Sequence, residues 1–342
     1  MNSLINCFEQ KKTGTVFVTG VAGFIGFHVA KKLLSMGKKV LGVDSLSDYY
    51  DVILKKNRVA HLKETFGDLF HFEKGSIEDK EKMKDVWESA SPKITHVVHL
   101  AAQAGVRYSL ENPYSYVETN VMGNVVLLEL ARHQKGVENF VYASTSSVYG
   151  DNEKMPFSEG DTTELPMALY AATKKCDELM SQAYAHLFRI PLTGLRFFSV
   201  YGPWGRPDMA LFIFTKNIME GKPISVFNQG DMKRDFTYIS DIVDGIIAAL
   251  ARPIKDDGKA APHRVYNLGN GNIELLSDYI AYIEKYVGKK AQINYLGMQP
   301  GDIPASLSDI TRAKKELGFE PKVRIEEGIK NFVAWYKEYY KA

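Results

Sequence analysis

The sequence lacks long apolar runs. A helix needs about 18 consecutive apolar residues to cross a bilayer, and no uninterrupted run of that length occurs among the 342 residues. The first dozen residues also lack the basic start and the apolar stretch of a secretory signal. We therefore expect a cytoplasmic protein that does not bind membranes.

Cysteine is scarce, and only Cys7 and Cys176 are present. Two thiols so far apart in the sequence provide no disulfide framework, which fits a reducing compartment. We expect Cys176 to be an ordinary small residue of a helix.

An excess of charge of one sign is missing as well. The net charge is +2, and Lys and Arg are scattered among Asp and Glu, so no basic track for nucleic acid is expected. The eight histidines show no metal-ligand spacing. His96 and His99, three residues apart on an expected strand, point to opposite faces. Neither nucleic acid nor a metal is therefore expected as a ligand.

Short β-branched runs alternate with segments of helical periodicity through the first part of the chain. This pattern predicts an α/β protein with a Rossmann-type, doubly wound parallel sheet that helices cover on both faces. The expected strands are residues 15–18, 40–43, 69–72, 94–100, 140–144 and 192–197.

Beyond Tyr201, loops rich in Pro and Gly separate a different set of helices. These are expected at residues 241–250, 276–287 and 325–340. We expect residues 1–200 to form the sheet domain, with segments near 236–270 returning to it, and residues 201–342 to form a smaller mixed α/β lobe. Ligands are expected in the cleft between them, at the carboxyl ends of the strands.

The segment TGVAGFIG follows the first expected strand and opens a helix. Gly20, Gly23 and Gly26 let the backbone approach a pyrophosphate at the helix N-terminus, where unpaired N–H groups and the helix dipole favour anions. Asp44 ends the second strand, where a carboxylate accepts hydrogen bonds from the adenosine ribose. Because Ser45 and the two residues after it carry no cation for a 2′-phosphate, NAD is favoured over NADP.

Tyr170 and Lys174 form a Tyr-x-x-x-Lys spacing on an expected helix. With 19 Tyr and 32 Lys in the chain, chance alone supplies about two such spacings. The second one, Tyr286 to Lys290, lies on an amphipathic helix, and we interpret it as structural. The first has the strand end YASTSSVYG, which contains Thr145, upstream of it. We therefore interpret Tyr170 and Lys174 as a catalytic pair.

Eight segments, in this order, resemble those of the extended short-chain dehydrogenase/reductases that act on nucleotide sugars. They are TGVAGFIG, HLAAQAGVRYSLENP, TNVMGNVVLLE, YASTSSVYG, LYAATKK, LRFFSVYGPWGRPDM, RDFTYISDIVDGI and QPGDIPASLSDI. The resemblance covers essentially the whole chain after residue 14. It is closest to the UDP-glucuronate 4-epimerases, through STSSVYG and SVYGPWGRPDMA.

The resemblance implies an isomerase that oxidises C4 of a UDP-sugar with tightly held NAD and then reduces the transient 4-keto intermediate from the opposite face. Tyr170 is then the base at the 4-hydroxyl, and Thr145 hydrogen-bonds the same oxygen. Lys174 stabilises the phenolate and holds the nicotinamide ribose. The domain 1–200 would bind NAD, and the lobe 201–342 would bind the UDP-sugar.

The residues after Thr145 separate related reactions. Dehydratases and UDP-glucuronate decarboxylases of this family resemble one another in carrying an acidic side chain there, whereas this chain has two serines, which favours epimerisation. A 4-keto glucuronate loses carbon dioxide readily unless its carboxylate is held still, which hydroxyls and a guanidinium do by charge-assisted hydrogen bonds. The residues expected to hold it are Ser146, Ser147, Ser199 and Arg206.

The resemblance also implies contacts to the UDP end and to the cofactor. Arg234 matches a phosphate-binding arginine, Asp302 an aspartate that binds the uridine ribose, and Phe227 the residue that borders uracil. Gln299 stands where several relatives place a second phosphate-binding arginine, and Arg107 either reaches the sugar or pairs with a neighbouring acid. Further cofactor contacts are expected from Phe24, Ile25, Ser76, Ile77, Leu100, Ala101, Ala102, Asn120 and Phe197, and a further substrate contact from Gln103.

The leading function is thus NAD-dependent 4-epimerisation of UDP-glucuronate to UDP-galacturonate. The alternatives are a UDP-glucose or UDP-N-acetylglucosamine 4-epimerase, a UDP-glucuronate decarboxylase, and a sensor that binds NAD without catalysis. The sensor is disfavoured because Thr145, Tyr170 and Lys174 are all present. The resemblance further implies a homodimer formed through the helices expected at 113–134 and 168–188.

Overall fold

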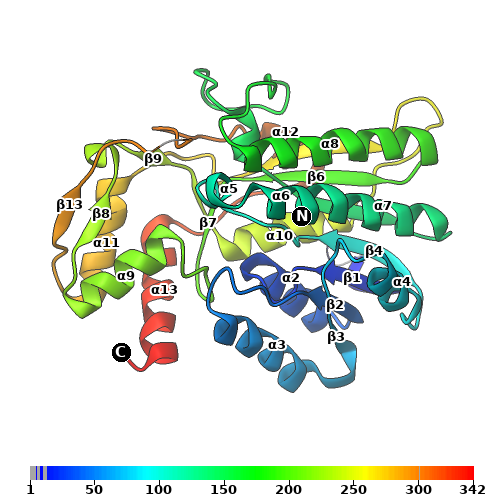
Figure 1. Ribbon diagram of the computed structural model, residues 1–342, viewed down its shortest axis with the longest axis horizontal. Coiled ribbons are helices and arrows are strands. Elements are labelled where there is room, and N and C mark those ends of the chain that lie inside the picture. Colours follow the sequence, from blue (N-terminus) through cyan, green and yellow to red (C-terminus); the bar gives the residue numbers. More distant parts are fainter. Residues whose placement is uncertain (1–4, 6–7, 11–13, 300) are drawn as a thin grey trace.

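A seven-stranded parallel sheet forms the centre of the molecule (Figure 1). The computed structural model describes residues 5, 8–10, 14–299 and 301–342, so Cys7 and Pro300 lie outside the described residues. The strands stand in the order β11, β6, β5, β4, β1, β2, β3. Their bounds are β1 (Thr15–Thr19), β2 (Val40–Asp44), β3 (Phe70–Lys74), β4 (Ile94–His99), β5 (Asn139–Thr145), β6 (Leu192–Phe197) and β11 (His263–Leu268). The expected doubly wound sheet is confirmed, and each expected strand is present within two residues of its predicted ends.

The order of the strands reverses beside β1. Strand β4 pairs with β1 and not with β3, so the chain returns to the middle of the sheet before it builds the other half. Open α/β sheets bind ligands outside the carboxyl ends of the strands at such a reversal. The topology therefore places the ligand site near the ends of β1 and β4.

Helices cover both faces of the sheet. Along β1, Val16 and Val18 belong to one cluster of buried apolar side chains and Phe17 to another, as the alternation of side chains in a strand requires. The first cluster includes residues of α2, α3 and α10, and the second includes residues of α4, α7 and α8. These helices are α2 (Phe24–Ser35), α3 (Val52–Phe66), α4 (Lys80–Glu88), α7 (Gly123–His133), α8 (Leu169–Phe188) and α10 (Ile239–Leu250).

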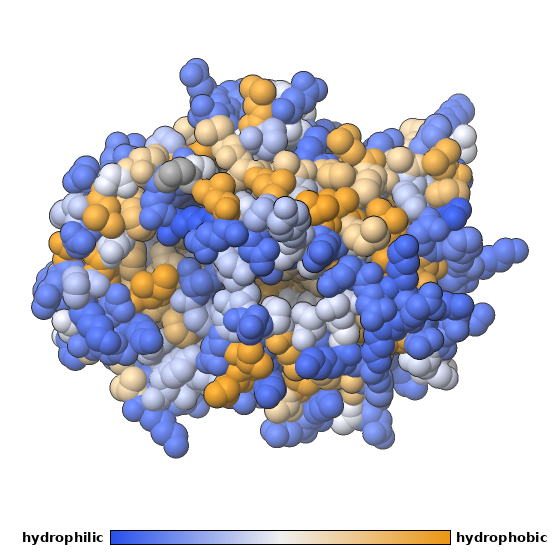
Figure 2. All heavy atoms as spheres, viewed as in Figure 1, coloured by the Kyte–Doolittle hydropathy of each residue, from blue (hydrophilic) through white to orange (hydrophobic). Residues whose placement is uncertain are grey.

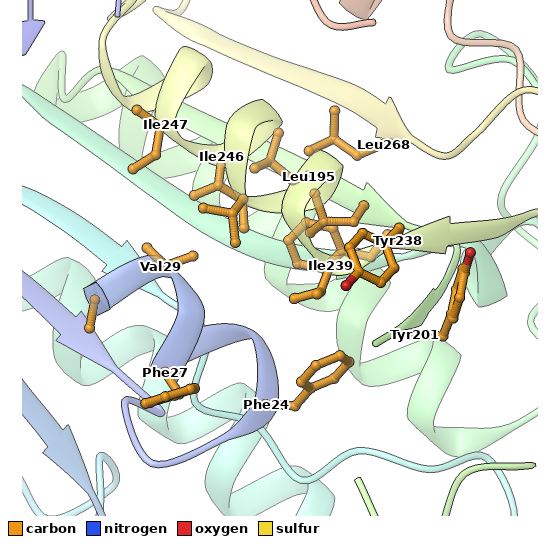
Figure 3. Close-up of a cluster of buried hydrophobic side chains, with 14 of the residues drawn as sticks. Phe24, Phe27, Val29, Leu195, Tyr201, Tyr238, Ile239, Ile246, Ile247 and Leu268 are labelled. Atoms are coloured by element: carbon orange, nitrogen blue, oxygen red, sulfur yellow. The ribbon is translucent and has the colours of Figure 1, made fainter. Parts of the chain in front are cut away.

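Helix α2, which opens from the glycine loop, packs against α10. Figure 3 shows Val29 of α2 pointing toward Ile246 of α10, and Phe24 pointing toward Tyr238. All four side chains are buried, and burying an apolar side chain of this size contributes about 1.5–3 kcal/mol. The start of α2 is therefore fixed against an element from the second half of the chain.

The C-terminal lobe lies at one end of the sheet (Figure 1). Its helices are α9 (Ala210–Glu220), α11 (Leu276–Val287) and α13 (Ile325–Tyr340), whereas α12 (Thr311–Leu317) packs beside β11 and α10. Its short strands are β7 (Ser199–Tyr201) paired with β10 (Phe236–Tyr238), β8 (Ile224–Val226) paired with β13 (Ile293–Tyr295), and β9 (Lys233–Arg234) paired with β12 (Glu274–Leu275). The helices expected at 276–287 and 325–340 are confirmed, and the one expected at 241–250 begins two residues earlier, as α10.

Between the lobe helices the chain returns to the sheet, where β11 pairs in parallel with β6. The short elements α5 (Tyr108–Glu111), α6 (Pro113–Tyr116) and the π-helical turn η2 (Val117–Met122) precede α7. The turns η1 (Gly67–Leu69), η3 (Ser146–Tyr149) and η4 (Asn228–Gly230) complete the fold. In the part of the chain that the structure describes, none of the helices combines the length and the apolar character needed to span a membrane.

Candidate active site

A cavity of about 1020 Å³ runs along the carboxyl ends of the strands and into the C-terminal lobe. It extends from the glycine loop at Gly20 past Tyr170 to Phe332 on α13. A volume at the upper end of the usual range for ligand pockets leaves room for more than one small ligand.

The glycine loop is shaped for a phosphate. Gly20 has a φ of +70°, and a Cβ on Gly26 would lie 2.0 Å from the carbonyl oxygen of Gly20, so neither position accommodates a larger residue. Helix α2 has Gly23 as its N-cap, with no side-chain cap and no acidic residue in its first turn. The N–H groups and the positive end of its dipole are therefore available to a pyrophosphate.

Asp44 stands at the end of β2, beside this loop. One of its carboxylate oxygens accepts from the backbone N–H of Ala22 at 3.0 Å and the other accepts from that of Leu46 at 2.8 Å. Burial raises the pKa of the Asp44 carboxyl. Because each oxygen has a second lone pair, the carboxylate can still receive a ribose hydroxyl.

One cation near Asp44, Lys55, was not predicted from the sequence. The Nζ of Lys55 on α3 donates to the carbonyl oxygen of Ser47 at 2.6 Å and to its Oγ at 2.9 Å. It comes from the following helix and not from the strand end, so inspection of the residues directly after Asp44 does not reveal it.

Nearly all the expected cofactor residues line the cavity. They are Gly20, Gly23, Phe24, Ile25, Gly26, Asp44, Ser45, Ser76, Ile77, Leu100, Ala101, Ala102, Tyr170, Lys174 and Phe197. Asn120 is the exception, because it is buried in η2 and its amide is already used. Its Oδ1 accepts from the N–H of Gln103 at 2.8 Å, and its Nδ2 donates to the oxygen of Gln103 at 3.1 Å and to Thr173 at 3.0 Å. The expected cofactor contact of Asn120 is thus corrected to a contact that holds Gln103, which itself lines the cavity.

Tyr170 and Lys174 lie one turn apart at the start of α8, and both line the cavity. The Nζ of Lys174 donates to a carboxylate oxygen of Asp177 at 2.7 Å, and both side chains are buried. Burial raises the pKa of Asp177 to about 6, against the attraction of Lys174. Asp177 was not expected from the sequence, although its position three residues after Lys174 on a helix is the signal for such a pair.

Thr145 ends β5 and lines the same cavity. Its Oγ1 accepts from the N–H of Ser147 at 3.2 Å and lies 3.2 Å from the Oγ of Ser147. The adjacent Ser144 donates to Glu178 of α8 at 2.7 Å, and Arg196 of β6 binds both oxygens of Glu178 at 2.8 Å. Glu178 therefore joins the helix that carries Tyr170 to β5, through the hydrogen bond of Ser144 beside Thr145, and to β6, through a buried ion pair.

Arg206 lines the cavity but already has a partner. Its Nε and one terminal nitrogen donate to the two oxygens of Asp208, at 3.0 and 2.5 Å. Burial alone would raise the pKa of the Asp208 carboxyl, but Arg206 outweighs it and holds that pKa below its ordinary value. Tyr49 also donates to Asp208, at 3.2 Å. Asp208 and Tyr49 were not expected from the sequence, and the second terminal nitrogen of Arg206 is the group left for a ligand.

At the far end of the cavity, two arginines share one carboxylate. Arg234 donates to Asp302 at 2.8 Å, and Arg107 lies 3.9 Å from the other oxygen of Asp302. The guanidinium of Arg107 also lies over the ring of Phe227, with 4.7 Å between its carbon and the ring centroid. Gln299 is absent from the lining of the cavity. This end is therefore rich in positive charge, with one aspartate between the two cations.

All ten expected substrate residues line the same cavity. They are Gln103, Arg107, Thr145, Ser146, Ser147, Ser199, Arg206, Phe227, Arg234 and Asp302. Among the residues that the structure describes, no group of three or more His, Cys, Asp or Glu side chains is arranged to hold a metal ion.

Comparisons with known proteins agree with this geometry. A family model described as GDP-mannose 4,6 dehydratase matches residues 17–332. The chain is 48% identical over 336 residues to UDP-glucuronate 4-epimerase 4 of Arabidopsis thaliana, covering 95% of this chain and 76% of that protein. It is 46% identical to a probable UDP-glucuronate 4-epimerase of Rhizobium meliloti, covering 95% and 97%. A crystal structure of UDP-glucuronic acid 4-epimerase from Bacillus cereus, in complex with UDP-glucuronic acid and NAD, is similar with a TM-score of 0.85 and 34% identity, covering 95% of this chain and all of that one.

Proposed function

We propose that the chain, which belongs to the family described as GDP-mannose 4,6 dehydratase, is an NAD-dependent isomerase that converts UDP-glucuronate to UDP-galacturonate by inverting C4. One observation carries the proposal. Tyr170, Lys174 and Thr145 line one cavity together with two serines in place of an acid and with Arg206. The uncapped glycine loop and Asp44 fit NAD, which supplies the oxidation of C4 and its reversal when bound.

Tyr170 removes the proton of the 4-hydroxyl and later returns one. A phenol with a pKa of about 10 is a weak base at neutral pH, so a nearby cation has to stabilise its phenolate. Lys174, one helical turn away, provides that charge, and its ion pair with Asp177 keeps the ammonium in place. The hydroxyl of Thr145 hydrogen-bonds the reacting oxygen and orients the sugar.

The 4-keto intermediate is a β-keto acid, and its carboxylate has to be held. If it turns perpendicular to the ketone, the C5–C6 bond breaks, carbon dioxide leaves, and the electron pair forms an enolate that is protonated at C5 to a 4-keto pentose. The free terminal nitrogen of Arg206 and the hydroxyls of Ser146, Ser147 and Ser199 hold the carboxylate in the ketone plane.

The opposite end of the cavity binds UDP. Arg234 binds the diphosphate, since a planar guanidinium can donate two parallel hydrogen bonds to a pair of phosphate oxygens. Asp302, which pairs with Arg234 in the structure, binds the uridine ribose, and Phe227 borders uracil with Arg107 over its ring.

The function is tested by incubating the purified protein with UDP-glucuronate, UDP-glucose and UDP-N-acetylglucosamine in separate reactions, and resolving the products by chromatography with mass detection. UDP-galacturonate of unchanged mass is expected from the first. Turnover of a neutral sugar alone would replace the proposal by a neutral 4-epimerase, a product lighter by carbon dioxide would indicate a decarboxylase, and no turnover of any sugar would leave a binding protein.

Arg206→Ala is expected to divert turnover from UDP-galacturonate to UDP-pentose. The substitution removes the cation at the carboxylate, so the affinity for UDP-glucuronate should also fall about tenfold to a hundredfold. Product ratios measured by mass detection and Kd values measured by calorimetry check both effects. Unchanged affinity together with no pentose would remove Arg206 from the carboxylate site.

The proposal extends to the whole molecule. Residues 1–200 form the NAD-binding domain, to which the segments near 236–270 return, and residues 201–342 otherwise form the UDP-sugar-binding lobe. The compartment is the cytoplasm, in keeping with an enzyme that uses NAD and nucleotide sugars. Fractionation of cells that carry a tagged chain tests the compartment.

The enzyme is also proposed to be a homodimer through α7 and α8. Figure 2 shows hydrophobic side chains gathered on the face where Figure 1 places these helices. Leu179 and Leu187, two turns apart on α8, are 60% and 66% exposed, and residues at that spacing share one side of a helix. An apolar stripe on a long helix suits a symmetric helical interface.

Leu187→Glu is therefore expected to halve the mass in solution, because it places a carboxylate on the apolar side of α8 that the dimer would bury. Light scattering coupled to gel filtration measures it against the chain mass of 38.5 kDa. Leu165→Glu is the matched control, since Leu165 is 72% exposed and lies outside α7 and α8. A wild-type chain that is monomeric would contradict the proposal.

A further inference from the structure

A fully buried arginine joins the glycine loop to the loop that carries Arg206. Arg58 on α3 is 0% exposed. Its Nη1 donates to the carbonyl oxygen of Ala22, within the glycine loop, at 2.8 Å. Its Nη2 donates to the carbonyl oxygens of Trp204 at 2.5 Å and Gly205 at 3.2 Å. One planar guanidinium thus links the backbone of the glycine loop to that of the loop before Arg206.

The hydrogen-bond partners of the Arg58 guanidinium are all uncharged groups. Besides the three carbonyl oxygens, Nη1 donates to the hydroxyl of Tyr50 at 2.8 Å. Among the residues that the structure describes, no carboxylate lies within ion-pair distance of Arg58, and Asp44 acts on it only at longer range. A buried cation without a paired carboxylate is costly. Its positive potential therefore acts beside the glycine loop and beside the loop that carries Arg206.

The loop that Arg58 binds, at Trp204 and Gly205, has an unusual backbone conformation. Trp204 has a φ of +60°, a left-handed conformation that an aromatic residue seldom adopts unless its surroundings hold it. Its ring packs against Phe27, with centroids 5.2 Å apart, and against Trp335 at 5.6 Å. His28 of α2 lies with Nε2 2.9 Å from the carbonyl oxygen of Pro203. The backbone immediately before Arg206 is thus held from α2, α3 and α13.

We propose that Arg58 is a positioning residue for the substrate carboxylate. By binding the carbonyls of Trp204 and Gly205 it fixes the peptide from which Arg206 extends, so that the free terminal nitrogen of Arg206 meets the carboxylate in the plane of the C4 ketone. Its unpaired charge adds to the attraction for that carboxylate. This inference rests on the proposed function and adds to it a residue that determines specificity without touching the substrate.

The first test is the ratio of UDP-pentose to UDP-galacturonate formed from UDP-glucuronate. This ratio does not depend on how much of a variant is folded, because only active molecules form products. Arg58→Gln is expected to raise the ratio by about tenfold to a hundredfold, since small misplacements of a holding group have effects of that size. Arg58→Lys keeps the charge but cannot bridge both loops, so it should raise the ratio less. Lys56→Met, at an exposed position of the same helix, should leave it unchanged.

The second test is binding without turnover, in a Tyr170→Phe background. Arg58→Gln is expected to weaken UDP-glucuronate about tenfold and to leave UDP-glucose within about twofold, as measured by calorimetry. Equal weakening of both ligands, or an unchanged product ratio in both Arg58 variants, would reduce Arg58 to a structural residue and overturn the inference. If the wild-type enzyme does not convert UDP-glucuronate at all, the proposed function fails and the inference falls with it.

Discussion

Tyr170→Phe is expected to lower kcat by about 10² to 10⁴-fold, because it removes the proton carrier of the reaction while preserving the ring. The ring of Tyr170 packs edge-on against Tyr116, with 6.0 Å between centroids, and phenylalanine keeps that contact. The affinity for UDP-glucuronate should therefore change little. Steady-state rates and calorimetric Kd values measured on the same preparation separate the two effects.

Tyr286→Phe is the matched control for this experiment. Tyr286 precedes Lys290 with the same spacing as the catalytic pair, but it lies on α11, where its hydroxyl contacts Glu326 at 3.0 Å. Its rate should equal that of the wild type. A Tyr170→Phe variant that keeps more than about a tenth of the activity would exclude Tyr170 as the general base, since base catalysis contributes at least about 10²-fold.

Lys174→Met is expected to abolish most of the activity and also to destabilise the fold. The loss of activity follows because the Tyr170 phenolate loses the cation that stabilises it. The loss of stability follows from Asp177, which remains buried without its partner, at a cost of about 3–5 kcal/mol. Urea unfolding measures the stability, and the product assay measures the activity.

A second substitution separates the two roles of Lys174. Adding Asp177→Asn removes the unpaired charge, so the double variant should regain about half or more of the lost stability while staying inactive. Lys175→Met is the control on the adjacent residue, whose 3.4 Å contact with Glu178 is partly exposed and is worth at most about 1 kcal/mol. Recovery of activity along with stability would show that Lys174 acts only through the fold.

Local patterns were sufficient to predict the sheet and most of the site. The parallel strands show as buried β-branched runs, and the glycine loop, Tyr170 and Lys174 follow them at regular distances along the chain. Because the carboxyl ends of parallel strands meet at one edge of a sheet, residues placed at those ends were predicted to share a cavity. The structure brings them to a single cavity.

The contacts that hold these residues could not be predicted in the same way. Arg58 and Trp204 are separated by 146 positions in the sequence, and nothing in either segment indicates that α3 lies against the loop before Arg206. Asp208 appears in the sequence as an ordinary loop residue, because only the folded chain brings Tyr49 to it. Asn120 was predicted to face the cofactor, but the π-helical turn in which it lies directs its amide to Gln103.

The ion pair between Arg196 and Glu178 has a consequence for how inversion takes place. It ties α8 to β6, and the hydrogen bond from Ser144 to the same Glu178 ties α8 to β5, which carries Thr145, so the wall that carries the acid–base groups is held as one rigid unit. A rigid wall presents its tyrosine from one direction only. For C4 to be rebuilt with the opposite configuration, the 4-keto sugar has to rotate within the site and present its other face to the same groups of the protein. This rotation takes place about the bonds between the sugar and the diphosphate. The enzyme therefore has to keep UDP bound while the sugar ring rotates.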